Sequence, residues 1–134
     1  MQAPSRITGD YWVHAERKHG VYPGHTAFGG KWLIFVSARN IDRMWERIRT
    51  AVEEGTLGAM AKAATARSNP EFSNANSKVI CVYTYDWRDE KDVKRIREAL
   101  RNLGVARKIA YKADQDTESG RYHAVGEKLS KYYE

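Results

Sequence analysis

The sequence predicts an α+β fold in which a mostly antiparallel sheet carries two helices on one face. The first observation is the apolar run over residues 29–36, whose apolar side chains fall on both parities and so predict a central strand with both faces covered. The second is a stretch rich in β-branched and aromatic residues at 78–85, which predicts a strand beside it. The third is that an amphipathic helix follows each of them. The order of elements therefore contains a βαββαβ core, for which a ferredoxin-like arrangement is the simplest architecture.

The first half of the chain is predicted to hold two strands, a loop and a helix. The side chains of residues 11–16 alternate between two faces in the pattern of a β-strand, which is placed at an edge of the sheet. Residues 17–28 have a loop composition, and their aromatic and imidazole content, including Tyr22, indicates a candidate rim of a site. Asn40 is a good cap and Gly55 a good terminator for a helix with apolar positions at Ile41, Met44, Trp45, Ile48 and Val52.

The second half of the chain is also predicted to contain strands, a loop and a helix. Residues 57–65 and 78–85 predict strands separated by a polar loop, and 108–112 a short last strand. Asp89 caps a second helix that Gly104 ends, with an apolar stripe at Val93, Ile96, Leu100 and Leu103. The opposite face of this helix is expected to be solvated; it consists of Lys91, Lys94, Arg95, Arg97, Glu98 and Arg101. Residues 121–134 suit either a final strand or a short helix.

Length and composition limit the class of protein. The 134 residues suit one domain over 1–134, frayed over 1–9, and the net charge of +6 modestly favours anionic partners. The single cysteine, Cys81, lies in an apolar run, so a disulfide framework is excluded and a reducing, cytoplasmic setting is expected. No apolar run is long enough for a membrane span. The histidines lack the spacing of a metal site, and we expect neither a metal nor a cofactor.

Lysines on the predicted strands form the candidate site. Lys62 is surrounded by alanines, so its ammonium group either snorkels to an edge or faces a polar cavity. Lys108 and Lys112 share one strand face, and if that face also carries Lys62, three ammonium groups converge as a phosphate site. Otherwise the two lysines at the ends of their short strand point into water. A strand end and two loops add the candidates Lys31, Arg67 and Arg121.

A series of motifs runs through the same predicted elements. They are Gly29-Gly30-Lys31-Trp32-Leu33-Ile34, Asp42-Arg43-Met44-Trp45, Lys78-Val79-Ile80-Cys81-Val82-Tyr83-Thr84 and Ile109-Ala110-Tyr111-Lys112. In this order they resemble the cap-binding translation initiation factor. Two further elements make the chain more similar to the basophilic leukaemia expressed protein family, which shares that fold; they are Leu57-Gly58-Ala59-Met60-Ala61-Lys62 and Tyr111-Lys112-Ala113-Asp114.

The resemblance implies a strongly curved sheet with the helices on its convex side and a ligand on its concave face. It also implies that Lys62 lies near the ligand's phosphates. The cap-binding factor needs two aromatic planes around its base, but Val82 stands at one of these positions here. Tyr22 is the nearest substitute for the other.

The chain is also similar, more faintly, to the bacterial phosphothreonine lyase effectors. Lys31 and Trp32 match part of that family's Lys-aromatic-His triplet, and Lys62 falls near its catalytic lysine. In that role Lys62 would remove the proton α to a carbonyl. Leu33 stands where the triplet has its histidine, so only His25 or His123 could supply the acid, by folding over the sheet.

The sequence therefore favours a binding module that holds a phosphorylated ligand on a basic concave sheet face. The ligand would be a nucleotide, an RNA end or a phosphorylated protein. The alternative is a phosphothreonine-lyase-like enzyme with Lys62 as general base. A third possibility is a protein-interaction domain that uses the charged face of the second helix.

Overall fold

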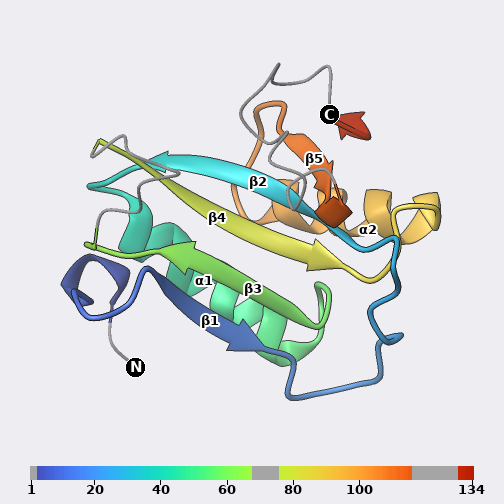
Figure 1. The fold of residues 1–134 in the computed structure, drawn as a ribbon, viewed down its shortest axis with the longest axis horizontal. Helices are drawn as coiled ribbons and strands as arrows, with labels where there is room; N and C mark the ends of the chain where they lie inside the picture. Colours follow the sequence, from blue (N-terminus) through green and yellow to red (C-terminus); the bar gives the residue numbers. More distant parts are fainter. Residues whose placement is uncertain (1–2, 68–75, 116–129) are drawn as a thin grey trace.

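Figure 1 shows the fold in a computed structural model, which describes residues 3–67, 76–115 and 130–134. In chain order the elements are the 3-10 helix η1 (Pro4–Arg6), β1 (Trp12–Glu16), β2 (Gly30–Ser37), α1 (Ile41–Glu54), β3 (Met60–Ala64), β4 (Ser77–Thr84), α2 (Glu90–Asn102), β5 (Ala110–Ala113) and β6 (Tyr132–Tyr133). The strands form one six-stranded sheet in the order β1-β3-β4-β2-β5-β6, and every pair within it is antiparallel.

The predicted α+β class is confirmed. The inner strands β3, β4, β2 and β5 form, together with both helices, the expected βαββαβ unit. β1 extends the curved sheet at one edge and β6 at the other. As predicted, the two helices cover one face, since side chains of α1 and α2 share a single apolar core with one parity of the strand residues.

Alternation along β2 decides which residues meet the helices. Trp32, Ile34 and Val36 face the core, and Trp32 is fully buried. The Trp32 indole Nε1–H donates to the Val93 carbonyl of α2 at 3.1 Å, so this helix is held by a directed bond as well as by packing. The alternate residues, among them Lys31, consequently lie on the other face of the sheet.

Gly30 allows β5 to pack closely. The ring of Tyr111, on β5, lies against Gly30, where a Cβ atom would meet the Tyr111 hydroxyl at 2.5 Å. That hydroxyl shares a 2.6 Å hydrogen bond with Thr84 Oγ1 at the end of β4. The glycine therefore lets an aromatic side chain join three adjacent strands on the core side.

The helix ends match the sequence signals, with one difference. Gly55 ends α1 at φ 88°, a left-handed conformation that favours glycine. Asp89 caps α2 by accepting from the Asp92 amide at 3.2 Å. Asn40, the predicted cap of α1, makes no such bond; its Oδ1 accepts from the Arg43 guanidinium at 2.8 Å instead.

The segment near the start of the chain differs from the expectation, and the last residues adopt one of the two predicted alternatives. Residues 1–9 were expected to fray, yet η1 contains a buried Pro4, and the Ser5 amide donates to Asp42 of α1 at 2.9 Å. At the other end, residues 130–134 include the strand β6, which pairs with β5. Residues 121–129 lie outside the described ranges. No helix in the described part of the chain combines the length and the apolar character that crossing a bilayer requires.

Arg97 corrects the prediction for α2. The helical pattern assigned it to the solvated face, but the side chain is fully buried. Its guanidinium donates to the carbonyl oxygens of Glu134 at 2.8 Å, Val105 at 3.0 Å and Arg107 at 2.6 Å. Desolvation lowers its pKa, as expected for a cation taken out of water. Arg97 therefore ties the end of the chain and the segment after α2 to the helix.

Replacing Arg97 by methionine keeps an apolar stem but leaves these three carbonyl oxygens without their donor. We expect Arg97→Met to lower the free energy of unfolding by about 3 kcal/mol, because buried acceptors that lose a charged donor do not regain water. Urea denaturation followed by circular dichroism measures the loss.

The matched control is Arg101→Met, one turn further along α2. Arg101 makes a surface ion pair with Glu98 at 2.9 Å, a contact that adds little stability. We expect Arg101→Met to unfold close to the unchanged protein. Equal losses in the two variants would show that the Arg97 contacts are unimportant.

Candidate functional site

The face of the sheet turned away from α1 and α2, called the open face below, carries the candidate site. Part of it is apolar, with Leu33, Val79 and Cys81 buried and the rings of Trp12 and Tyr83 packed beside them. Cationic side chains of the same parity lie among these groups. They are Lys31 on β2, Lys62 on β3 and Lys112 on β5.

Lys62 is held between aromatic rings. Its Nζ lies 4.0 Å from the centre of the Trp12 ring and 6.0 Å from that of Tyr83, within the range of cation–π attraction. No ion pair joins Lys62 to an acid among the described residues. Its positive charge is therefore stabilised without being neutralised.

Lys31 and Lys112 lie directly opposite each other on β2 and β5, and both are buried. The Lys31 ammonium donates to Asp114 Oδ1 at 2.9 Å. The carboxylate of Asp114 therefore pairs with the Lys31 ammonium, which lowers the cost of burying that charge.

Cys81, on β4, lies opposite Lys62 of β3 and opposite Leu33 of β2. Burial raises the pKa of its thiol to about 11, although the ammonium groups of Lys62 and Lys31 both act to lower it. The thiol is therefore protonated near neutral pH, and Cys81 is a core residue of the open face, as predicted.

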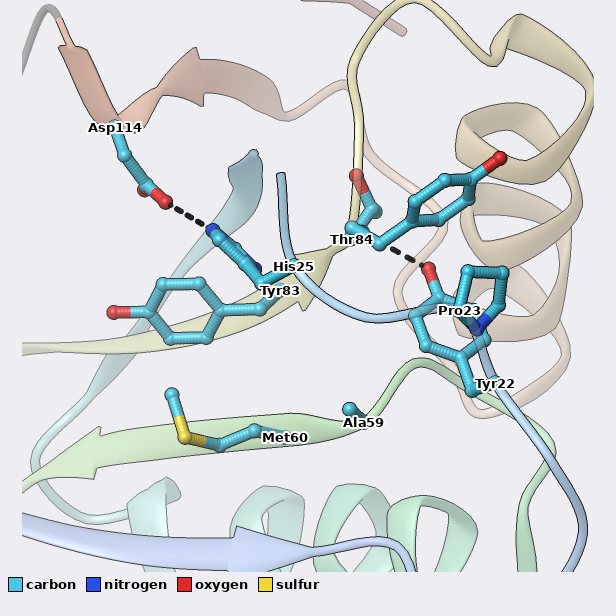
Figure 2. A pocket seen from close by; sticks show the side chains of 9 residues that line it. Tyr22, Pro23, His25, Ala59, Met60, Tyr83, Thr84 and Asp114 are labelled. Atoms are coloured by element: carbon cyan, nitrogen blue, oxygen red, sulfur yellow. Dashed lines mark hydrogen bonds and ion pairs between the residues drawn. The ribbon is translucent and has the colours of Figure 1, made fainter. Parts of the chain in front are cut away.

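A pocket of about 370 Å³ opens at one end of this face, where β3 begins and β4 ends. Figure 2 shows the loop between β1 and β2 passing over it. Its lining is largely apolar and aromatic, with a carboxylate at one side; the residues are Tyr22, Pro23, His25, Ala59, Met60, Tyr83, Thr84, Tyr85 and Asp114. Such a mixture suits a flat, polar-edged ring.

His25 fixes the loop over the open face. Its Nε2 lies 2.8 Å from Asp114 Oδ2, and its ring meets Tyr83 edge-on with centroids 6.3 Å apart. A Cβ atom on Gly29 would stand 1.9 Å from the same Nε2. The glycine pair at the start of β2 thus has a packing role on each face, Gly30 for Tyr111 and Gly29 for His25.

Tyr22 lines the pocket but is also an anchor. Its hydroxyl donates to Asp92 Oδ2 at 2.5 Å and accepts from the Tyr85 amide at 3.2 Å. Burial and the bond to Asp92 raise its pKa well above the usual range. Tyr22 therefore attaches the loop to α2 while presenting its ring to the pocket, and its part in ligand binding stays a prediction.

The other predicted site residues do not join Lys62. Lys108 precedes β5 and is exposed, with its Nζ 5.9 Å from the Tyr133 ring, so it is not one of the buried lysines of the open face, and its part in ligand binding stays a prediction. Arg67 lies beyond the far end of β3, where it donates to the Gly9 carbonyl at 2.9 Å. Arg121 lies outside the described residues.

Sequence reasoning missed Met60 and Tyr83 as parts of a site. The alternation of β3 and β4 already assigns them to the face of Lys62, so their parity was a usable signal. Asp114 was noted within a motif but without a role. Across the described ranges no group of three or more histidine, cysteine and acidic side chains is arranged to hold a metal ion.

Comparison with known proteins gives a fold. Schistosome eIF4E complexed with m7GpppA and 4E-BP aligns with a TM-score of 0.60 and 20% identity, over 80% of this chain and 59% of that one. C. elegans eIF4E-3, in complex with the 4E-binding protein Mextli and a cap analog, aligns with a TM-score of 0.52 and 21% identity, over 69% of this chain and 54% of that one. The chain thus spans little more than half the length of either protein, and the likeness confirms the predicted fold alone.

Comparison with protein families gives a membership. The model of one family, described as basophilic leukemia-expressed protein Bles03, matches residues 25–118. This range holds both helices, the strands from β2 to β5 and the contact between His25 and Asp114. Because the match covers most of the chain, the protein belongs to the basophilic leukemia-expressed protein Bles03 family.

Proposed function

We propose that the open face binds a phosphorylated ligand, with its phosphates at Lys62 and its ring in the adjoining pocket. The observation that carries the proposal is the ammonium group of Lys62, which is held by two aromatic rings and by no acid among the described residues. A lysine kept in place without a carboxylate retains its attraction for an anion.

The pocket and Lys62 are close enough to serve one ligand. Tyr83 both lines the pocket and lies 6.0 Å from Lys62 Nζ. Met60, also in the lining, is two residues from Lys62 on the same face of β3, about 7 Å along the strand. A nucleotide could therefore stack its base at Tyr83 and direct its phosphates toward Lys62.

Asp114 supplies the polar edge that a nucleobase requires. Its carboxylate already accepts from Lys31 and lies against His25, and carboxylate oxygens have lone pairs for further donors. N–H groups on the edge of a base are such donors. The ligand class expected to fit best is thus a nucleotide or an RNA end, and a phosphorylated protein would use only the Lys62 half of the site.

The structural neighbours support the proposal by analogy of fold. The schistosome and C. elegans proteins were solved with a cap dinucleotide and a cap analog, and both complexes also contain a binding protein. A shared fold does not transfer a ligand. The analogy therefore adds to the argument from Lys62 and does not replace it.

The lyase alternative gains no such support. Leu33 stands where a histidine would be needed; His25 does lie over the open face, as that role requires, but its Nε2 is engaged by Asp114. We therefore expect a phosphothreonine peptide incubated with the protein to keep its mass and to release no phosphate. A mass loss by elimination, abolished in Lys62→Gln, would replace the binding proposal with the enzymatic one.

Binding should depend on salt and on Lys62. Titration with GTP, ATP and m7GpppA, followed by calorimetry, is expected to show affinity that falls between about 50 mM and about 200 mM salt. Lys62→Gln should weaken the best of these ligands about tenfold, or about 1.4 kcal/mol, because it removes the central cation and leaves the rings in place.

Lys91→Gln is the matched control, since it removes the same charge from an exposed position on α2. It should change the affinity less than twofold. The absence of binding at low salt, or an equal loss of affinity in the two variants, would refute the proposal.

Filling the pocket should separate ring binding from phosphate binding. Ala59 is exposed at the pocket wall, so Ala59→Phe occupies the space without disturbing the core. The variant is expected to bind GTP about tenfold more weakly, while its weak binding of ribose 5-phosphate, a probe without a base, stays unchanged. Unaltered GTP binding would mean that the pocket holds no base.

A further inference from the structure

We propose that three arginines at the other end of β2 form a second site, which docks a phosphorylated, extended peptide. They surround a hollow of about 620 Å³ between the end of β2, the start of α1 and the segment after α2. Its lining residues are Phe35, Val36, Ser37, Asn40, Arg43, Met44, Arg47 and Arg107. The pocket of the open face lies at the opposite end of β2, so this proposal is independent of the proposed function.

The hollow is lined by three guanidinium groups and no carboxylate. Arg43 donates to the side-chain oxygen of Asn40 at 2.8 Å, and Arg47 to the Leu103 carbonyl at 3.2 Å. Arg107 donates to the Phe35 carbonyl. All three acceptors are neutral, so the contacts orient the guanidinium groups without cancelling their charge.

The acids nearest in sequence are engaged elsewhere. Glu46, between Arg43 and Arg47, pairs with Arg49, which also bonds Glu53 at 2.9 Å and lowers the pKa of the Glu46 carboxyl. Asp42 accepts from the Ser5 amide and hydroxyl in η1. Arg88, Arg95 and Arg101 elsewhere on the surface each have a carboxylate partner, and the three arginines of the hollow have none among the described residues.

Two polar groups that line the hollow have, among the described residues, no hydrogen-bond partner that an anion would have to displace. Ser37 Oγ is buried and has no hydrogen-bond partner in the described part of the chain. Asn40 precedes α1 without capping it, so the first amides of this 14-residue helix receive no side-chain oxygen from the cap position. A phosphate monoester offers the several oxygens and the double negative charge that three guanidinium groups, a hydroxyl and a helix start can share.

The edge of β2 favours a peptide as the carrier of this phosphate. β2 pairs with β4 along its whole length but with β5 only over Gly30–Leu33. Residues 34–37 therefore lack a strand neighbour on that side within the described ranges. The Phe35 carbonyl already accepts from Arg107, so an extended peptide would pair its backbone with the remaining groups of this edge, whereas a nucleic acid has no peptide backbone with which to do so. Phe35, 46% exposed, offers the peptide an apolar contact beside the charge.

The test is fluorescence anisotropy with labelled degenerate peptides that contain phosphoserine, phosphothreonine or phosphotyrosine, each against its unphosphorylated match. We expect one phosphorylated pool to bind at least tenfold more tightly than its match. Arg47→Gln, on α1, and Arg107→Gln, in the segment after α2, should each weaken this binding about tenfold, and thermal melting verifies that both variants fold.

Two controls separate the second site from general charge and from the open face. Arg101→Gln removes one charge from α2 and should leave peptide binding unchanged, as should Lys62→Gln. The proposal is overturned if phosphorylation has no effect, if Arg101→Gln weakens binding as much as Arg47→Gln, or if a 5′-phosphorylated RNA oligomer binds more tightly than every peptide pool. Loss of binding in Lys62→Gln alone would assign the phosphopeptide to the open face instead.

Discussion

The burial of Trp32 is the constraint on which the rest of the structure depends. This side chain lies under α2, donates to the Val93 carbonyl and meets Tyr111 of β5 at a centroid separation of 5.3 Å. Since strand side chains alternate, a buried Trp32 leaves Lys31 no place but the open face. Antiparallel register then sets the neighbours of Lys31, with Lys112 opposite on β5 and Tyr83 opposite on β4. The packing of Trp32 under α2 thus places Lys31 of β2, and with it Lys112 and Tyr83 of the two neighbouring strands, on the opposite face of the sheet.

The open face handles its charges in two different ways. Lys31 is neutralised by Asp114, whereas Lys62 is held by the rings of Trp12 and Tyr83. A cation held by aromatic rings keeps most of its long-range field, because a ring quadrupole carries no net charge. The apolar surface beneath, centred on Cys81, excludes water and strengthens that field. The arginines follow the same contrast: among the described residues, those of the hollow beside β2 have no carboxylate partner, whereas Arg95 and Arg101 on α2 each have one.

Hydrophobic periodicity and helix-cap residues predicted the fold. The predictions that were wrong or incomplete concern residues whose partners lie far away in the sequence. The strands and helices followed from period and cap signals, but the common face of Lys31 and Lys62 depends on how the strands pair, which only the structure shows. Lys108 was predicted to lie on the last strand, but β5 begins only at Ala110. Arg97 was misassigned because its acceptors belong to other segments, the farthest being Glu134. The loop over residues 17–28 was predicted as the rim of a site, but the residues that it meets were not, since His25 and Asp114 meet across 89 residues, a pairing that no local pattern encodes.

The most direct test of the central claim, that the open face is the ligand-binding face, is an amide NMR titration of the full chain with m7GpppA and GTP at about 50 mM salt. The account predicts saturable shifts that are largest in β3 and β4 around Met60, Lys62 and Tyr83, and that fade as salt is added. Shifts confined to α1 and α2, or no shifts at low salt, would contradict it.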